Sequence, residues 1–130
     1  MLALDDVIAA ADFRSALRSF MRESERVARK SGLTPQRYLL LLMIKGAPNK
    51  TEESTVTELA RRLQLAQSTV TELVSRAEES GLVERRQSGV DGRVAHLRLT
   101  TEGERRLELS FIALETERRQ LRDAVDQAIG

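Results

Sequence analysis

The sequence lacks several residue types on which enzymes and metal proteins depend. Among its 130 residues there is no cysteine and no tryptophan, and His96 is the only histidine. Without cysteine the chain forms no disulfide, no thiolate metal site and no thiol redox sensor. A single imidazole does not complete a metal site, so we predict no metal and no cofactor. The chain also lacks a glycine-rich phosphate loop and a paired-carboxylate motif, and we therefore predict that it is not an enzyme.

Long hydrophobic runs are missing as well. The longest run, Tyr38 to Ile44, is far too short to cross a bilayer. The first residues, Met-Leu-Ala-Leu-Asp-Asp, lack the basic region of a signal peptide. We therefore expect a cytoplasmic protein that has no membrane partner.

An excess of charge of one sign is also absent, because the net charge is only +1. The hydrophobic share of 41% and the charged share of 32% fit one mainly helical, soluble domain. The charges are unevenly distributed, however. Residues 85–98 contain four arginines and one acid, whereas residues 101–130 contain five arginines and seven acids. A locally basic segment on a nearly neutral chain indicates a confined anion-binding surface.

The segment 56–82 organises the rest of the chain. Apolar residues recur at helical spacing in two short blocks, which predicts two helices joined by a tight turn. Thr55 and Glu58 form a capping box that sets the start of the first helix. Ala66 precedes the second helix and offers no capping side chain, which costs about 1 kcal/mol.

The second of these helices presents a small polar surface away from the core. At 100° per residue, the outward side chains are Ser68, Glu72, Ser75 and Glu79, flanked by Thr69, Thr71 and Arg76. Such a helix suits the major groove of DNA, where hydrogen bonds read the base edges. Gln67 and Arg76 have the geometry for bidentate contacts to adenine and guanine. Two interpretations of Glu72 stay open: an acceptor for cytosine N4, or a solvated charge paired with Arg76.

The remaining segments supply helices on both sides and a hairpin. Periodicity and end signals predict helices over residues 4–30, 35–45 and 101–129. Strands are predicted over 82–86 and 93–99, joined by a tip that contains the turn signal Asp-Gly. Because His96 falls on the outer face of the second strand, we expect it to be solvated, with a phosphate contact as the second interpretation.

Both terminal helices carry an apolar stripe that needs a partner. In the last helix the stripe has a 4-3 spacing, interrupted at Arg118. Its members are Leu107, Phe111, Leu114, Leu121, Val125 and Ala128. The middle of the chain is too small to cover both stripes, so we expect these helices to pack against a second copy of the chain. Packing within one chain is the alternative.

Taken together, these motifs resemble those of the MarR family of bacterial winged-helix transcription regulators. The resemblance rests on the helix-turn-helix, the hairpin pair Asp91-x-Arg93 and the exit Leu99-Thr100-x-x-Gly103. The segment 33–38, Leu-Thr-Pro-Gln-Arg-Tyr, is similar to the opening of the family's second helix. The chain departs from the family pattern in two places. In the turn, Gln64 and Ala66 replace a Gly and a Ser that are often found there. Glu72 stands where a basic residue is common.

The resemblance implies a mainly α fold with a small β-hairpin, a winged helix-turn-helix with long dimerisation helices. Residues 1–130 would form a single domain. Segments 1–32 and 101–130 would form the dimer interface, and residues 34–100 the DNA-binding lobe. Recognition helix 67–80 would enter the major groove of a pseudo-palindromic double-stranded operator, and wing 86–94 the minor groove. A homodimeric repressor released by a small-molecule effector of unknown identity is the hypothesis we favour. A winged-helix protein-interaction module that does not bind DNA is the alternative.

Ten residues are the candidate DNA contacts. Arg93 matches the family's wing arginine, and Asp91 matches the acid that orients the wing tip. Arg85, Arg86 and Arg98 suit phosphate contacts, which set register without reading sequence. The complete set is Gln67, Ser68, Thr69, Thr71, Glu72, Ser75, Arg76, Arg86, Asp91 and Arg93. For an anionic effector, the candidate partners are Arg14, Arg18 and Arg37.

Overall fold

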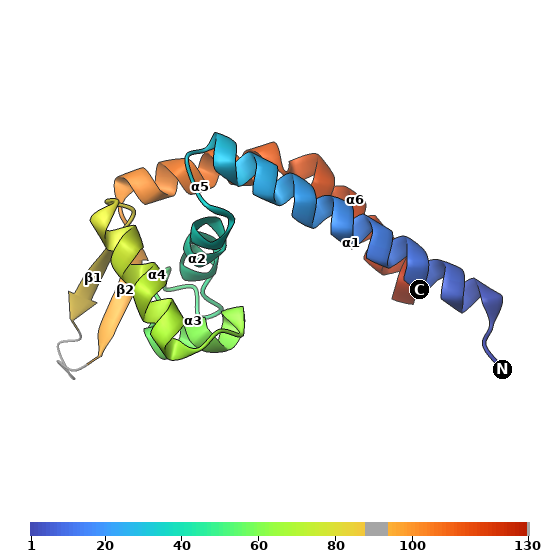
Figure 1. Ribbon diagram of the computed structural model, residues 1–130, viewed down its shortest axis with the longest axis horizontal. Helices are drawn as coiled ribbons and strands as arrows, with labels where there is room; N and C mark the ends of the chain where they lie inside the picture. Colours follow the sequence, from blue (N-terminus) through green and yellow to red (C-terminus); the bar gives the residue numbers. More distant parts are fainter. Residues whose placement is uncertain (88–93, 130) are drawn as a thin grey trace.

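The computed structural model describes residues 1–87 and 94–129, and the features reported below are those of these residues. Within them the chain forms six helices, one more than predicted, and one two-stranded antiparallel sheet (Figure 1). The mainly helical fold with a small hairpin is confirmed. The elements are α1 (Leu4–Lys30), α2 (Pro35–Lys45), α3 (Val56–Leu63), α4 (Gln67–Glu79), β1 (Val83–Gln87), β2 (Ala95–Leu99), α5 (Thr101–Ala113) and α6 (Glu115–Ile129).

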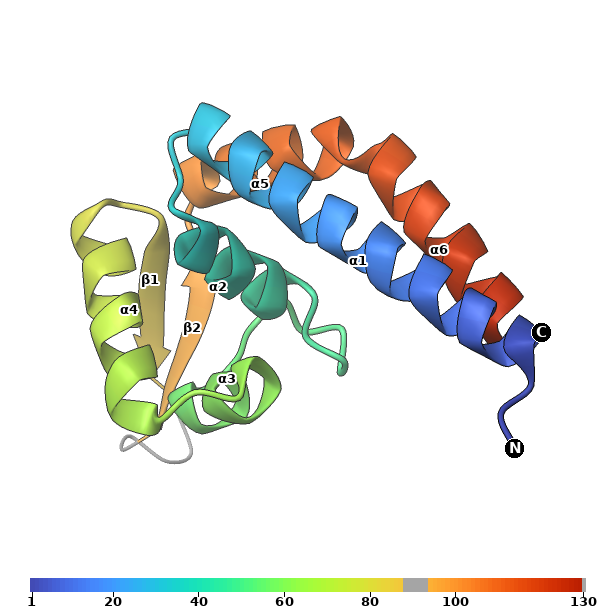
Figure 2. The same cartoon turned by 45° about the vertical axis from the view of Figure 1, so that its right-hand side comes forward.

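The elements divide into two regions that differ in shape. Helices α2, α3 and α4 gather with the hairpin into a lobe, defined here as residues 34–100 (Figures 1 and 2). Helices α1 and α6 lie side by side and extend away from it as an arm (Figures 1 and 2). Helix α5 joins the lobe to the arm. None of the described helices is long and apolar enough to cross a membrane.

Local capping signals explain where the helices begin. The Thr34 hydroxyl accepts a hydrogen bond from the amide of Arg37, and Pro35 occupies the first helical position of α2. The predicted capping box between Thr55 and Glu58 is confirmed at the start of α3. Ala66 supplies no side-chain acceptor to α4, also as predicted. The predicted bounds of α1, α2 and α4 agree with the structure to within one residue, and α3 begins where its capping box predicted.

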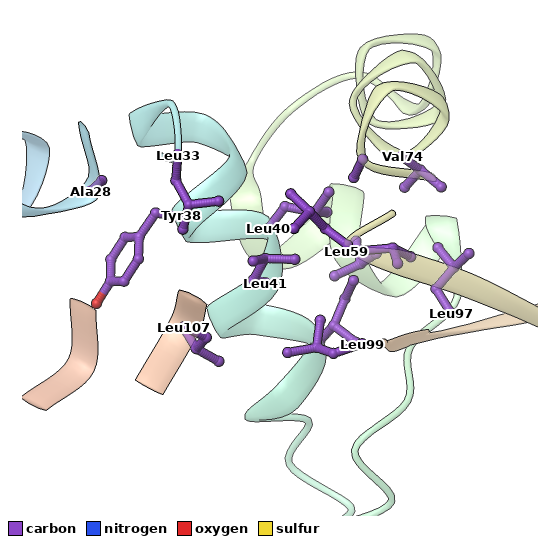
Figure 3. Packing of buried hydrophobic residues seen from close by; sticks show 14 of the residues in the cluster. Ala28, Leu33, Tyr38, Leu40, Leu41, Leu59, Val74, Leu97, Leu99 and Leu107 are labelled. Carbon is purple, nitrogen blue, oxygen red and sulfur yellow. The ribbon is translucent and has the colours of Figure 1, made fainter. Parts of the chain in front are cut away.

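Helix α2 lies at the centre of the lobe because it is apolar on most sides. Leu40, Leu41 and Ile44 are fully buried, and α3, α4, the hairpin and α5 pack around them (Figure 3). Tyr38 faces α5 at the edge of this cluster, and burial raises the pKa of its hydroxyl (Figure 3). The core side chains contributed by the surrounding elements are Leu59, Val70, Val74, Leu82, Leu97, Leu99 and Leu107.

The two strands pair in register, with Val83 opposite Leu99 and Gln87 opposite Ala95. Each described strand begins one or two residues later than predicted. A third backbone segment joins the sheet at Ser54, whose amide donates to the Leu97 carbonyl at 3.1 Å and whose carbonyl accepts from the Leu97 amide at 2.8 Å. The sequence analysis assigned no helix or strand to Ser54. Such an isolated bridge carries no periodicity that a sequence pattern could reveal.

The predicted single C-terminal helix is wrong, because the helix breaks at Leu114. The side chain of Leu114 is fully buried, and its amide donates to the Phe111 carbonyl in a tighter turn. Arg118 Nη1 donates to the same carbonyl at 2.6 Å, and its guanidinium stacks on the Phe111 ring. A side chain that binds a backbone carbonyl in place of the helical amide is a recognised cause of a kink. Arg118, which interrupts the apolar stripe in sequence, therefore stabilises the break.

The arm shows how the terminal stripes are partly covered within one chain. Helices α1 and α6 pack along each other, so the intramolecular contact that the sequence analysis kept as an alternative is present. This contact does not cover all the apolar surface. Several large apolar side chains of α1 and α5 are exposed: Leu4, Val7, Ile8, Met21, Leu109, Phe111 and Ile112.

Candidate nucleic-acid interface

The outer surface of α4 has the polar character that the helical periodicity predicted. Val70, Val74 and Ala77 are fully buried against the lobe, which fixes the rotation of the helix. The predicted contact residues consequently lie on the opposite side. Gln67, Ser68, Thr69, Thr71, Glu72 and Arg76 are exposed, and Ser75 is half-buried.

The turn before α4 has an unusual residue at its critical position. Gln64 adopts a left-handed conformation with φ of 55°, where glycine is most easily accommodated. The tight turn therefore forms despite the absence of glycine. Beyond it, Gln67 Nε2 donates to Thr57 Oγ1 at 3.3 Å and links the two helices. Because Ala66 offers no cap, the first turn of α4 presents its amides at a helix N-terminus, which favours an anion.

Glu72 is paired on the helix surface with Arg76. Arg76 Nη2 lies 2.6 Å from Glu72 Oε1, and both side chains are more than half exposed. This pair at i and i+4 is one of the two interpretations that the sequence left open for Glu72. An exposed pair of this kind is worth only about 0.5 kcal/mol, so it opens readily when another partner approaches.

Each of the three arginines on the described strands of the hairpin is paired with a glutamate. Arg85 Nε lies 2.8 Å from Glu78 Oε1 on α4, and Arg98 Nε lies 2.7 Å from Glu84 Oε1 across the sheet. The third described arginine, Arg86, binds a glutamate of the segment before α3. The prediction of a locally basic surface is therefore wrong for these three arginines. Tertiary structure places a carboxylate beside each guanidinium, and sequence counts over neighbouring residues did not reveal it.

The pair between Arg86 and Glu53 has the most extensive hydrogen bonding of the three. Arg86 Nε donates to Oε1 at 2.9 Å and Nη2 donates to Oε2 at 2.6 Å, a bidentate geometry. The guanidinium lowers the pKa of the Glu53 carboxyl, and the carboxylate raises the pKa of Arg86. His96 Nδ1 lies 4.0 Å from the same carboxylate, and its side chain is 32% exposed on the outer face of the sheet. Glu53 was missed by the sequence analysis because its partners are distant in sequence.

The hairpin tip, with its predicted contacts Asp91 and Arg93, lies outside the described residues. Those two assignments stay predictions.

The structure also contains an apolar cavity between α1 and α2. Its volume is about 140 Å³, and its walls include Phe20, Met21 and Tyr38. Among the residues that line it, Glu25 is the charged one. The arginines proposed for an anionic effector, Arg14, Arg18 and Arg37, do not line this cavity, so the structure does not bring them together there.

The comparisons with known proteins agree with this arrangement. A model of the MarR family matches residues 31–94. The chain is 32% identical to the HTH-type transcriptional repressor IacR of Pseudomonas putida over 89 residues, 68% of this chain and 51% of that protein. It is 35% identical to the HTH-type transcriptional repressor YetL of Bacillus subtilis over 77 residues, 59% of this chain and 45% of that one. The chain thus spans about half the length of these relatives.

Solved structures match over most of the fold. The crystal structure of a mutant MarR from E. coli with operator DNA superposes with a TM-score of 0.68 at 20% identity. The match covers 92% of this chain and 85% of that one, which includes both the lobe and the arm. The winged-helix fold, the matched family model and the similar repressors agree. The chain belongs to the MarR family.

Proposed function

We propose that this protein is a homodimeric, sequence-specific DNA-binding transcription regulator, a repressor released by a small ligand. The observation that carries the proposal is the exposed polar face of α4, held outward by Val70, Val74 and Ala77. In this proposal α4 enters the major groove, where its hydroxyls and amide meet base edges. The wing, residues 86–94, enters the adjacent minor groove. The similar proteins IacR and YetL are named repressors, and the similar MarR crystal structure holds operator DNA, which supports the assignment.

The predicted contact residues fall into two groups in this proposal. The uncharged side chains on α4 read bases or bind the backbone directly: Gln67, Ser68, Thr69, Thr71 and Ser75. At the wing tip, the family resemblance assigns a DNA contact to Arg93 and the orientation of the tip to Asp91. Glu72, Arg76 and Arg86 are engaged in ion pairs in the free protein. They contact DNA only where those pairs open.

The arm supports the homodimer part of the proposal. Leu4, Val7 and Ile8 lie exposed near the start of α1, at the far end of the arm, and Leu109 and Ile112 lie exposed on α5, beside the lobe. Segments 1–32 and 101–130 are therefore assigned to the dimer interface. A two-fold axis across the arm would place the start of α1 of each copy against α5 of its partner. Such a contact is isologous, because both copies contribute the same surface.

The direct test selects bound fragments from genomic DNA and measures their affinity against salt. With six or more phosphates neutralised by the dimer, the affinity falls roughly a thousandfold between about 50 and 200 mM salt. Arg93→Ala weakens binding by about 1–3 kcal/mol and flattens the slope, whereas Arg119→Ala on α6 changes neither. A protein that selects no fragment, or an Arg93→Ala variant that binds like the parent, contradicts the proposal. A light-scattering mass of twice 14.6 kDa tests the dimer.

A protein-interaction module that does not bind DNA is the second candidate. The observation that favours it is the pairing of Arg85, Arg86 and Arg98 with glutamates, which leaves less free positive charge than DNA-binding surfaces commonly present. If this candidate is right, the protein binds a protein partner and shows no salt-dependent affinity for any DNA duplex. The same fragment selection separates the two candidates.

A further inference from the structure

The outer face of the wing sheet carries a row of charged and titratable side chains. Strand geometry places Glu84 and Arg86 of β1 on the same face as His96 and Arg98 of β2, with Arg86 directly opposite His96. The other face packs Val83, Leu97 and Leu99 into the core. This row therefore belongs to the solvent side of the hairpin.

Glu53 reaches this row because its neighbour is bound to the sheet. Ser54 exchanges two backbone hydrogen bonds with Leu97, which holds the segment before α3 against the free edge of β2. The Glu53 carboxylate lies close to His96 on β2 and accepts two hydrogen bonds from Arg86 on β1. The contact spans 33 positions of sequence and ties the root of the wing to the body of the lobe.

Burial distinguishes Glu53 from the other glutamates that pair with arginines near the interface. Its side chain is 13% exposed, against 29% for Glu78, 48% for Glu84 and 64% for Glu72. A DNA phosphate that drew Arg86 away would leave this carboxylate largely buried without its strongest donor, which is unfavourable. The exposed pairs of Glu84 and Glu72 carry no such penalty and exchange partners readily.

We propose that Glu53 is a positioning residue of the DNA-binding surface, which holds Arg86 in an intramolecular pair and keeps it away from phosphates. The inference rests on the proposed function. Phosphate contacts strengthen binding to DNA of every sequence, and they carry no sequence information themselves. By withholding Arg86, Glu53 lowers sequence-independent affinity, so that a larger share of the binding energy comes from α4 and the wing tip. The sequence-level assignment of Arg86 as a phosphate contact is replaced by this role.

The test uses a mixed-sequence duplex of about 30 base pairs, so that no operator has to be known. Binding is measured by fluorescence anisotropy from about 50 to 200 mM KCl, where the slope against log salt reports the number of phosphates engaged. Glu53→Gln frees Arg86 and steepens the slope by about 0.9 per subunit, with roughly tenfold tighter binding at the lowest salt. Glu53→Gln combined with Arg86→Gln removes both charges and restores the affinity and slope of the parent.

Glu84→Gln is the matched control. It makes the same change of charge on the same face of the sheet and releases Arg98, whose pair is already exposed. We expect it to leave the slope of the parent unchanged. If Glu84→Gln changed the slope and the affinity as much as Glu53→Gln does, the change in net charge alone would explain the result. That outcome would overturn the proposal. Circular-dichroism melting of each variant confirms that it is folded.

Two further outcomes also overturn the proposal. If Glu53→Gln leaves the slope of the parent unaltered, Arg86 is not withheld. If the double variant loses about 0.9 of slope per subunit, Arg86 already contacts phosphate in the parent protein. Loss of DNA binding by the parent and by every variant is a different result, since it removes the proposed function together with this inference.

Discussion

The lobe and the arm of this molecule differ in how they are stabilised. All fully buried hydrophobic side chains among the described residues lie between Val27 and Leu114. Neither residues 4–26 of α1 nor the described side chains of α6 include a buried residue. The lobe thus contains its own core, whereas the arm is two amphipathic helices that cover only one face of each other.

This difference shows that a sequence can specify two packed helices and still leave much of their apolar surface exposed. Helices with so few buried side chains gain little free energy from burial, and the ordering of their side chains opposes folding. The exposed leucines and isoleucines of α1 and α5 would gain most from a second surface. The substitutions below test two things: the stabilisation of the lobe by its own core, and the proposed stabilisation of the arm by a second copy of the chain.

The largest expected effect is in the centre of the lobe. Leu40→Ala removes a fully buried side chain of α2 and lowers the free energy of unfolding by about 4 kcal/mol, because a cavity remains. Leu39→Ala is the matched control on the same helix, since Leu39 is 42% exposed and its loss should cost less than about 1 kcal/mol. Urea denaturation measures both. Equal losses would contradict the assignment of the core.

The next effect is at the junction of lobe and arm. A Cβ added at Gly103 would lie 2.1 Å from the backbone carbonyl oxygen of Leu82, so α5 would have to shift. Gly103→Ala should lower the free energy of unfolding by about 3 kcal/mol, and Thr101→Ala, exposed on the same turn, by far less. Thermal melting distinguishes the two. A Gly103→Ala protein as stable as the parent would show that the contact is not rigid.

Association of the arm should respond to charge in its apolar surface. Ile112 is 60% exposed, and Ile112→Glu should raise the dimer dissociation constant by roughly tenfold to a hundredfold, about 1.4–2.7 kcal/mol. Gln36→Glu adds the same charge at an exposed site on α2, outside the segments assigned to the interface, and serves as the control. Sedimentation equilibrium gives both constants. If the two variants associate equally well, this surface is not the interface.

A smaller change adds the missing cap of α4. Ala66→Ser supplies a hydroxyl to the free amides and should raise the stability of the lobe by about 1 kcal/mol, whereas Ala66→Val should not. The gain is measured by urea denaturation at several protein concentrations. Because the cap lies in the lobe, the gain should be independent of concentration, and a dependence would show that the two regions are coupled.

The smallest effect is the pH dependence of stability that Glu102 causes at the start of α5. Arg105 and Arg106 donate to Glu102 and lower the pKa of its carboxyl from 4.5 to about 2. Since the folded pKa lies below the unfolded one, this stabilisation is complete above pH 4.5 and disappears as the pH falls through 2. Glu102→Gln should therefore differ from the parent in urea midpoint at pH 7 and match it near pH 2. A constant difference would assign the effect to another cause.

The motif Leu99-Thr100-x-x-Gly103 at the start of α5 shows what a sequence pattern can and cannot predict. The residues Leu-Thr-x-x-Gly were recognised as a family signature, and their chemistry follows from the structure. Thr100 Oγ1 accepts from the Gly103 amide and donates to the Gly81 carbonyl at 2.6 Å, so one hydroxyl caps α5 and fixes the chain before the hairpin. The cap was predictable, because it joins residues three apart. The close approach of Gly103 to Leu82 was not, because it depends on how α5 crosses the lobe.

The sequence by itself determined the starts of α1 to α5, the position of α2 in the centre and the outward face of α4. These features depend on hydrogen bonds and periodicities that act within about four residues. Only the tertiary structure decided the break at Leu114, the pairing of α1 with α6 and the acids that neutralise the hairpin arginines. Glu53 and Arg86 are 33 positions apart, and such a contact exists only once the backbone bridge at Ser54 has brought the two segments together.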